Sequence, residues 1–239
     1  MRSKRSLFEI ENPPHVYLNT DYHLLYHDRK DEKFQPAQLR IEFSDHSSID
    51  ESIQVKARGV YRKEYCSMPP ISLNLKKARN PELRRLQNIK MVVGCDKSAY
   101  SEQLIVKEYL TYRIYNLLTD KSFRVQLCRL HFIDSGNASR SYGQLGFLIE
   151  NVDQMARRVS CLALNPGYRL TQLGREQTNI MNVFEYMIGN TDFTYHLNRN
   201  IKLLRNEYDP ASPPMPVPYD FDYSGLVNAR YAIPHPDYR

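Results

Sequence analysis

The sequence predicts an α+β fold of two lobes, in which an antiparallel sheet with one long helix precedes an incomplete C-terminal lobe. Three observations predict it. Short runs of alternating apolar and polar residues fill the first half, a long segment of helical periodicity interrupts them, and two helical segments with polar loops follow. We place the N-lobe, with an N-terminal extension, at residues 1–150 and the partial C-lobe at residues 151–239.

Four strands are predicted before the long helix, because each run alternates between apolar and polar residues and most end near Gly or Pro. A strand-like stretch, HVYLNTD, precedes them in the N-terminal extension. The four strands are expected at residues 38–43, 53–60, 71–75 and 89–93.

The long helix is predicted over residues 101–118, with Ser101 as the N-cap residue and Glu102 directly after it. Its apolar stripe falls at helical spacing, which predicts the face that packs against the core. The stripe consists of Val106, Leu110, Ile114 and Leu117.

The remaining elements are two strands, two helices and a further strand. The second helix ends at Gly189, a residue that suits a helix C-terminus because it tolerates a positive φ. The strands are expected at residues 124–133, 144–149 and 200–204, and the helices at 152–159 and 175–188.

Composition limits the function classes. The net charge of +6 suits an anionic ligand, whereas no dense Lys/Arg block interleaves with aromatic residues, so a nucleic-acid partner is not supported. No apolar run is long enough to span a membrane. The N-terminus has basic residues but no apolar signal core, which predicts a chain that is cytosolic or already free of its signal.

Four cysteines are spaced widely and form no C-x-x-C pair, which argues against a metal site. Several lie in strand-like runs. We therefore expect Cys66, Cys95, Cys128 and Cys161 to be buried thiols.

Two polar clusters carry the residues that phosphoryl transfer requires. The first, NTDFTYHLNRN, contains Asp192 and either Asn198 or Asn200, and the second, PVPYDFDYSG, contains Asp220 and Asp222. In such a site one Asp orients the attacking hydroxyl, while an Asn and a second Asp hold the Mg²⁺ that bridges the nucleotide phosphates. The order predicts Asp192 as the catalytic residue and Asn200, Asp220 and Asp222 as metal ligands.

The order of strands, helices and polar loops matches a protein-kinase-like bilobal fold. In that fold a strand Lys pairs with the nucleotide and with a Glu on the following helix. These positions correspond to Lys90 and Glu108, but Glu108 lies off the apolar stripe, so a solvated side chain is an equal alternative. The other options are Glu102 for the acid and Lys76 or Lys77 for the base.

A phosphate-covering loop is predicted around Arg58 and Gly59, where strand 53–60 ends. A single Gly makes a turn but does not let backbone N–H groups cover phosphates along a whole loop. Arg58 and Arg62 would then supply charge. The alternative is an ordinary hairpin.

The chain resembles the CotH family of kinase-like proteins, named for a bacterial spore-coat kinase, and its relatives in Bacteroidetes-type bacteria. The motifs that carry the resemblance lie between about residues 50 and 231, and the most specific are GNTDFTYHLNRNIKLL and PVPYDFDYSG. The resemblance implies phosphorylation of protein Ser/Thr with ATP and Mg²⁺ or Mn²⁺, and an exported or cell-surface location. It also implies that Asp222 replaces the Gly of the kinase D-F-G motif.

Two departures from the family leave the activity open. Many members carry Trp where this chain has Phe193, and the chain ends soon after DFDYSG, where a kinase C-lobe would continue. We therefore expect uncovered apolar surface on the 175–188 helix and the 200–204 strand. The alternatives to a kinase are a kinase-fold pseudoenzyme that acts as a surface or structural binding protein, and an enzyme that transfers AMP or glutamate.

Overall fold

The chain divides into two compact units in the computed structural model, which describes residues 6–31, 33–59, 61–195 and 199–233. Unit 1 comprises Met1–Val106 and Val125–Glu150, and unit 2 comprises Lys107–Arg124 and Asn151–Arg239. The expected lobe boundary at residue 150 is one of the boundaries between units. Residues 107–124, however, belong to unit 2.

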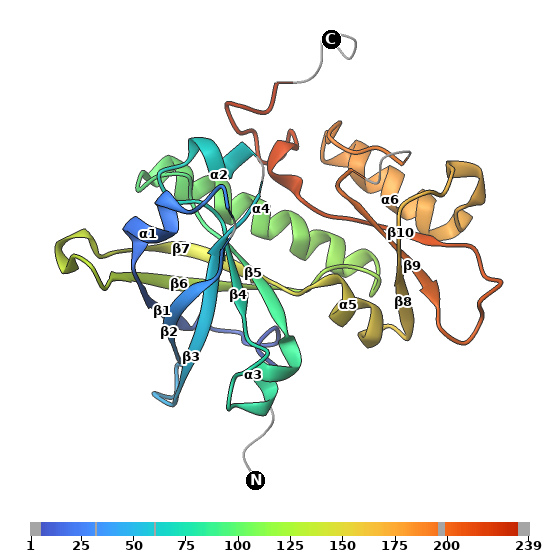
Figure 1. The fold of residues 1–239 in the computed structure, drawn as a ribbon. Helices are drawn as coiled ribbons and strands as arrows, with labels where there is room; N and C mark the ends of the chain where they lie inside the picture. The colour runs from blue at the N-terminus through green and yellow to red at the C-terminus, as the bar shows by residue number, and fades with distance from the viewer. Residues whose placement is uncertain (1–5, 32, 60, 196–198, 234–239) are drawn as a thin grey trace. The chain divides into compact units, whose positions relative to one another are not determined.

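Unit 1 is built around a closed seven-stranded β-barrel with the strand order β1-β2-β3-β4-β5-β7-β6 (Figure 1). Neighbouring strands are antiparallel except β1 and β6, which run parallel, with Val16 opposite Leu130. Closure leaves the barrel without an unpaired edge. The strands are β1 (His15–Thr20), β2 (Gln35–Glu42), β3 (Ser48–Ala57), β4 (Ile71–Asn74), β5 (Asn88–Val92), β6 (Val125–Asp134) and β7 (Tyr142–Ile149).

The predicted protein-kinase-like bilobal fold is therefore wrong, because its N-lobe sheet is replaced by a closed barrel. The difference arises at β1, which the sequence analysis assigned to an N-terminal extension. Val16 and Leu18 alternate into the barrel core, and the backbone of β1 pairs with β2 on one side and β6 on the other. The alternation of a strand predicts its buried face but does not identify its partners.

The interior of the barrel is apolar because each strand contributes every second residue. In β2 the buried apolar residues are Ala37, Leu39 and Ile41, and the side chains between them are exposed. The same alternation in β5 directs Ile89 and Met91 into the core. Three short helices, α1 (Tyr22–His27), α2 (Tyr61–Tyr65) and α3 (Pro81–Leu86), and the 3-10 turn η1 (Ala138–Arg140) connect the strands.

Helix α4 (Ala99–Leu118) forms where a long helix was predicted, but the predicted apolar stripe is wrong. Leu117 is 84% exposed, and Leu110 is 49% exposed. The buried residues on α4 recur instead at another set of helical positions, which are Ser101, Ile105, Glu108, Thr111, Tyr112 and Tyr115. The prediction counted aliphatic side chains and therefore missed a face made largely of polar and aromatic residues. None of the described helices is long and apolar enough to cross a membrane.

Unit 2 contains a three-stranded antiparallel sheet of order β10-β9-β8. Helix α6 has Met181 and Phe184 completely buried, and Met181 packs with residues of β9 in the unit core. The elements are α5 (Val152–Arg158), β8 (Cys161–Leu164), α6 (Arg175–Met187), β9 (Ile201–Asn206) and β10 (Met215–Pro218), with the 3-10 turns η2 (Leu170–Gln172) and η3 (Phe221–Tyr223) (Figure 1).

Uncovered apolar surface was expected on the 175–188 helix and on the 200–204 strand. The expectation is correct for the helix, α6, and wrong for the strand, β9. Val183, Tyr186 and Met187 on α6 are 67%, 90% and 60% exposed. In contrast, the apolar residues of β9 are buried between β8, β10 and the unit core, because the strand is central in its sheet. They are Ile201, Leu203 and Leu204.

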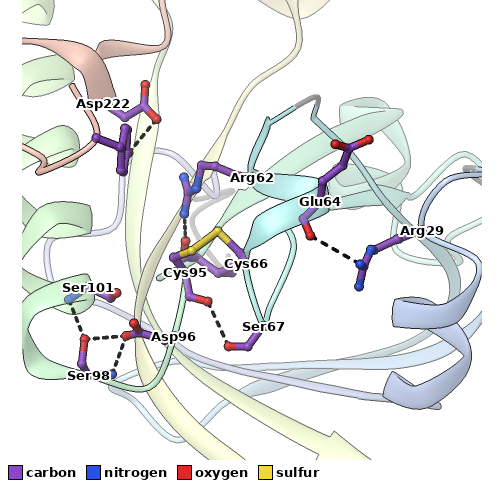
Figure 2. The surroundings of a disulfide bond; sticks show 12 residues. Arg29, Arg62, Glu64, Cys66, Ser67, Cys95, Asp96, Ser98, Ser101 and Asp222 are labelled. Carbon is purple, nitrogen blue, oxygen red and sulfur yellow. Dashed lines mark hydrogen bonds between the residues drawn. A yellow bond between two sulfur atoms is a disulfide. The ribbon is translucent and has the colours of Figure 1, made fainter. Parts of the chain in front are cut away.

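The cysteine prediction is correct for two residues and wrong for the other two. Cys128 and Cys161 are buried free thiols. Cys66 and Cys95 form a disulfide, which joins the segment after α2 to the segment after β5 (Figure 2). The Cys95 carbonyl also accepts hydrogen bonds from the Ser67 backbone and hydroxyl, at 3.0 Å each. Spacing along the chain does not reveal such a pair, because the fold alone brings the two cysteines together.

Loss of the disulfide is expected to destabilise unit 1. The two cysteines are 29 positions apart, and releasing a loop of this length costs about 3–4 kcal/mol in the chain-entropy account. Chemical denaturation of the oxidised protein with and without reductant measures the difference. A Cys66→Ser/Cys95→Ser double variant is the control, since its unfolding midpoint should not respond to reductant. Equal midpoints for the oxidised and reduced wild-type protein would contradict the prediction.

Candidate functional site

The candidate site lies at the open end of the β9–β10 hairpin in unit 2. Asn200 directly precedes β9 and Asp220 follows β10 by two positions. The Tyr219 N–H donates to the Asn200 carbonyl at 3.0 Å, which extends the ladder past the last strand pair, Ile201 and Pro218. The hairpin therefore brings Asn200 and Asp220 to the same end of the sheet.

Asp192 joins this end from the loop after α6. An isolated antiparallel bridge between Thr194 and Arg199 turns the chain back toward β9. The Asn200 side-chain Nδ2 then donates to the Asp192 carbonyl at 2.7 Å and to Asp192 Oδ2 at 3.0 Å. Arg199 forms a salt bridge of 2.5 Å with Asp192 Oδ1. Asn198, the alternative to Asn200, lies outside the described residues.

The electrostatic environment of Asp192 combines burial with charges of both signs. Burial raises the pKa of Asp192 and is the largest effect, whereas Arg199 and Asn200 lower it and Asp220 raises it. Because the folded-state pKa is raised, protonation of Asp192 favours folding at low pH, and this stabilisation is lost as the pH rises through the folded-state pKa.

Tyr112 on α4 positions Asp220 and was missed by the sequence analysis. The Asp220 N–H donates to the Tyr112 hydroxyl oxygen at 2.8 Å. Burial raises the pKa of Tyr112 well above its ordinary value, and the charges of Glu108 and Asp220 raise it further. Phe221 packs edge-on against the Tyr112 ring at 4.6 Å between centroids. The signal available in the sequence was the spacing of Tyr112, one helical turn after Glu108.

Two residues at this end of the hairpin have an uncommon backbone conformation. Asn200 and Asp220 have φ values of 54° and 67°, in the left-handed region that residues other than Gly rarely adopt. Asn and Asp are the side chains that tolerate this region best, because they hydrogen-bond locally. Strained backbone of this kind recurs at functional sites.

Two further predicted site residues, Glu108 and Asp222, also raise the pKa of Tyr112 through their charges. Asp222 accepts a hydrogen bond of 2.8 Å from the Tyr231 hydroxyl. Glu108 is only 2% exposed, so the alternative of a solvated Glu108 is wrong. Glu102, the other acidic option, accepts the Leu145 N–H at 2.5 Å.

The predicted nucleotide-binding residues of unit 1 stay predictions. Lys90 lies on β5, on the face opposite the core residues Ile89 and Met91. Arg58 and Gly59 follow β3, and Gly59 has a φ of 91°, which explains a glycine there without a ligand. Both alternative bases, at positions 76 and 77, are exposed.

The donor atoms of the site suit a hard divalent cation. Because Asn200 turns its Nδ2 toward Asp192, its Oδ1 faces away from Asp192 and is available, like the Asp220 carboxylate, as an oxygen ligand. Within the described ranges no group of three or more His, Cys, Asp or Glu residues is arranged to hold a metal. One carboxylate and one amide oxygen still fit Mg²⁺, which takes few protein ligands and completes its shell with phosphate oxygens and water.

Comparison with known proteins adds no assignment. No protein-family model matches the chain, and no curated protein matches it significantly. The resemblance to the CotH family therefore stays a prediction.

Two variants of the charges around Asp192 are expected to shift its pKa in opposite directions. Arg199→Gln should raise the pKa of Asp192, because it removes a nearby cation, and Asp220→Asn should lower it, because it removes a nearby anion. Carboxyl-carbon NMR titration measures both. Asp209→Asn is the matched control, since Asp209 lies in the turn at the opposite end of the hairpin. Shifts of the same sign in the first two variants would show that the two charges do not act on Asp192 as described.

Proposed function

We propose that the Asp192–Asn200–Asp220 cluster binds a nucleotide with a divalent cation and supports phosphoryl transfer to a hydroxyl group. The observation that carries the proposal is the convergence of two carboxylates and an amide at the open end of the β9–β10 hairpin. The proposal rests on unit 2 alone. It does not require the kinase-like fold that the barrel of unit 1 excludes.

Asp192 is assigned to the attacking hydroxyl. Its carboxylate accepts a hydrogen bond from that hydroxyl and takes its proton as the new O–P bond forms, while the bond between the γ-phosphorus and the leaving nucleoside diphosphate breaks. Arg199 and Asn200 fix the orientation of the Asp192 carboxylate through contacts with its two oxygens.

Asp220 and Asn200 are assigned to the cation. When bound, a Mg²⁺ or Mn²⁺ ion neutralises the phosphate charge that develops during transfer. Tyr112 holds the Asp220 backbone, so Asp220 presents its carboxylate from a fixed position. Asp222 is engaged by Tyr231 and is assigned no direct part in binding.

The proposed substrate class comes from the family resemblance, which points to ATP and to protein Ser/Thr. The motifs that carry it contain the same residues that converge in the structure, Asp192, Asn200 and Asp220. The resemblance also implies nucleotide contacts for Lys90, Arg58 and Gly59, which lie in unit 1, and for Glu108; the proposal for unit 2 does not depend on them.

A second candidate function is nucleotide binding without turnover. Both carboxylate oxygens of Asp192 already have partners, Arg199 on Oδ1 and Asn200 on Oδ2. A carboxylate whose two oxygens both have partners accepts a hydrogen bond from a substrate hydroxyl less readily. This favours a pseudoenzyme, which would bind nucleotide without turnover. Transfer of AMP or glutamate is distinguished from phosphorylation by the mass of the product.

Binding is tested by thermal unfolding with ATP and Mg²⁺ or Mn²⁺. Nucleotide at a hundredfold excess over its Kd should stabilise the protein by about 2.7 kcal/mol, which appears as a rise of several degrees in Tm. ATP with chelator and cation without ATP are the controls. An unchanged Tm at millimolar ATP with either cation would overturn the proposal.

The assigned roles are tested by two isosteric variants. Asp220→Asn should weaken Mn·ATP binding about tenfold or more, because it removes a charged metal ligand. Asp192→Asn should leave that affinity nearly unchanged and lower turnover by roughly 10²–10⁴, the usual contribution of a general base. Calorimetric titration and product mass spectrometry measure the two effects, with Asp209→Asn as control. Equal losses of affinity in both variants would show that the roles are assigned wrongly.

A further inference from the structure

The C-terminus of α6 places the side chain of Asn190 between Glu185 and Asp192. The Asn190 N–H donates to the Glu185 carbonyl at 2.9 Å and the Gly189 N–H donates to the Tyr186 carbonyl at 3.1 Å. Gly189 has a φ of 64°. This pair of bonds with a left-handed glycine is the Schellman motif, which fixes the chain direction after the helix.

The Asn190 side chain connects the helix to the catalytic loop. Its Oδ1 accepts the Asp192 backbone N–H at 3.0 Å. Its Nδ2 is buried and has no hydrogen-bond partner within ordinary distance among the described residues. One end of the amide therefore holds Asp192, and the other end faces the protein interior.

Glu185 is the buried group that complements this amide. Its side chain is 2% exposed, and neither carboxylate oxygen has a hydrogen-bond partner within ordinary distance in the described part of the chain. Burial raises the pKa of Glu185 to about 7, and the Asn190 side chain lowers it. The charge of Glu185 raises the pKa of two tyrosines on neighbouring segments, Tyr115 on α4 and Tyr195 beyond Asp192.

We propose that Glu185 is a positioning residue for Asp192, acting through the side-chain amide of Asn190. The inference rests on the proposed function for its catalytic meaning, but the contact itself does not. An ionised Glu185 attracts the Asn190 Nδ2, so the Oδ1 stays directed at the Asp192 N–H. A protonated Glu185 instead presents a hydroxyl donor, which competes with the Asp192 N–H for the same Oδ1.

The protonation of Glu185 then adjusts the catalytic loop near neutral pH. Because the folded-state pKa lies above the ordinary value, the protonated form favours folding, and this stabilisation is lost as the pH rises from about 4.5 through about 7. The ionised form is the less stable one and the one that positions Asp192. A carboxyl group that is kept at such a cost is typical of functional sites.

Amide exchange of Asp192 tests the contact without any ligand. In the wild-type protein the NMR protection factor, corrected for intrinsic exchange, should rise several-fold between pH 6 and pH 8. Glu185→Leu should reduce the protection of the Asp192 amide about tenfold at pH 8. Glu185→Gln should retain the protection, but its protection should not rise between pH 6 and pH 8. Leu removes the buried charge at similar volume, so the variant is expected to fold. Glu176→Gln, an exposed residue in the first turn of α6, is the control.

The proposal would be overturned if the Asp192 amide of Glu185→Leu were as well protected as that of the wild type. It would also be overturned if protection in Glu185→Gln still rose between pH 6 and pH 8. Kinetics then test its catalytic meaning. Glu185→Leu should lower turnover several-fold with Mn·ATP affinity unchanged, and affinity lost together with turnover would overturn the assignment to Asp192. A wild-type protein that binds no Mn·ATP would overturn the proposed function, while the exchange experiment would still decide the role of Glu185.

Discussion

The candidate site is organised around the β9–β10 ladder, which a backbone hydrogen bond from the Tyr219 N–H to the Asn200 carbonyl extends by one position. Each of the two strand segments then leaves the sheet through a residue with positive φ, Asn200 before β9 and Asp220 after β10. The ladder therefore fixes Asn200 relative to Asp220, and the Asn200 amide in turn holds the carbonyl and the carboxylate of Asp192. Sites supported on strand ends in this way are more precisely placed than sites on free loops.

Unit 2 buries polar groups around this site at a cost in stability. Glu108, Tyr112 and Glu185 are each at most 3% exposed, in positions that apolar side chains would fill more favourably. The hydrogen bond that the Tyr112 hydroxyl accepts from the Asp220 N–H offsets part of the free-energy cost of burying that hydroxyl. The other face of α6 shows the reverse arrangement, because the large side chains of Val183 and Tyr186 are exposed to solvent. The helix therefore departs from simple amphipathicity at the residues that support the loop of Asp192.

The sequence contained enough information for many of the elements. Alternation located most strands of the barrel, and helical periodicity located α4, α5 and α6, whereas β8 and β10 were not predicted. Several failures depended on long-range contact. The partner of β1, the bond between Cys66 and Cys95, and the hydroxyl of Tyr112 on the Asp220 backbone each join distant segments, and no local pattern encodes such pairs.

The parallel pairing of β1 with β6 also governs the order in which the barrel assembles. His15 and His131, joined by a hydrogen bond of 2.8 Å between ring nitrogens, are 116 positions apart. Contacts of this separation form late, because the closure of a long loop precedes any energetic gain. During synthesis β1 leaves the ribosome first and keeps one edge unpaired until β6 follows. The newly made chain thus carries an open strand edge while the segment between Thr20 and Val125 is synthesised, a period in which pairing with another nascent chain competes with closure of the barrel.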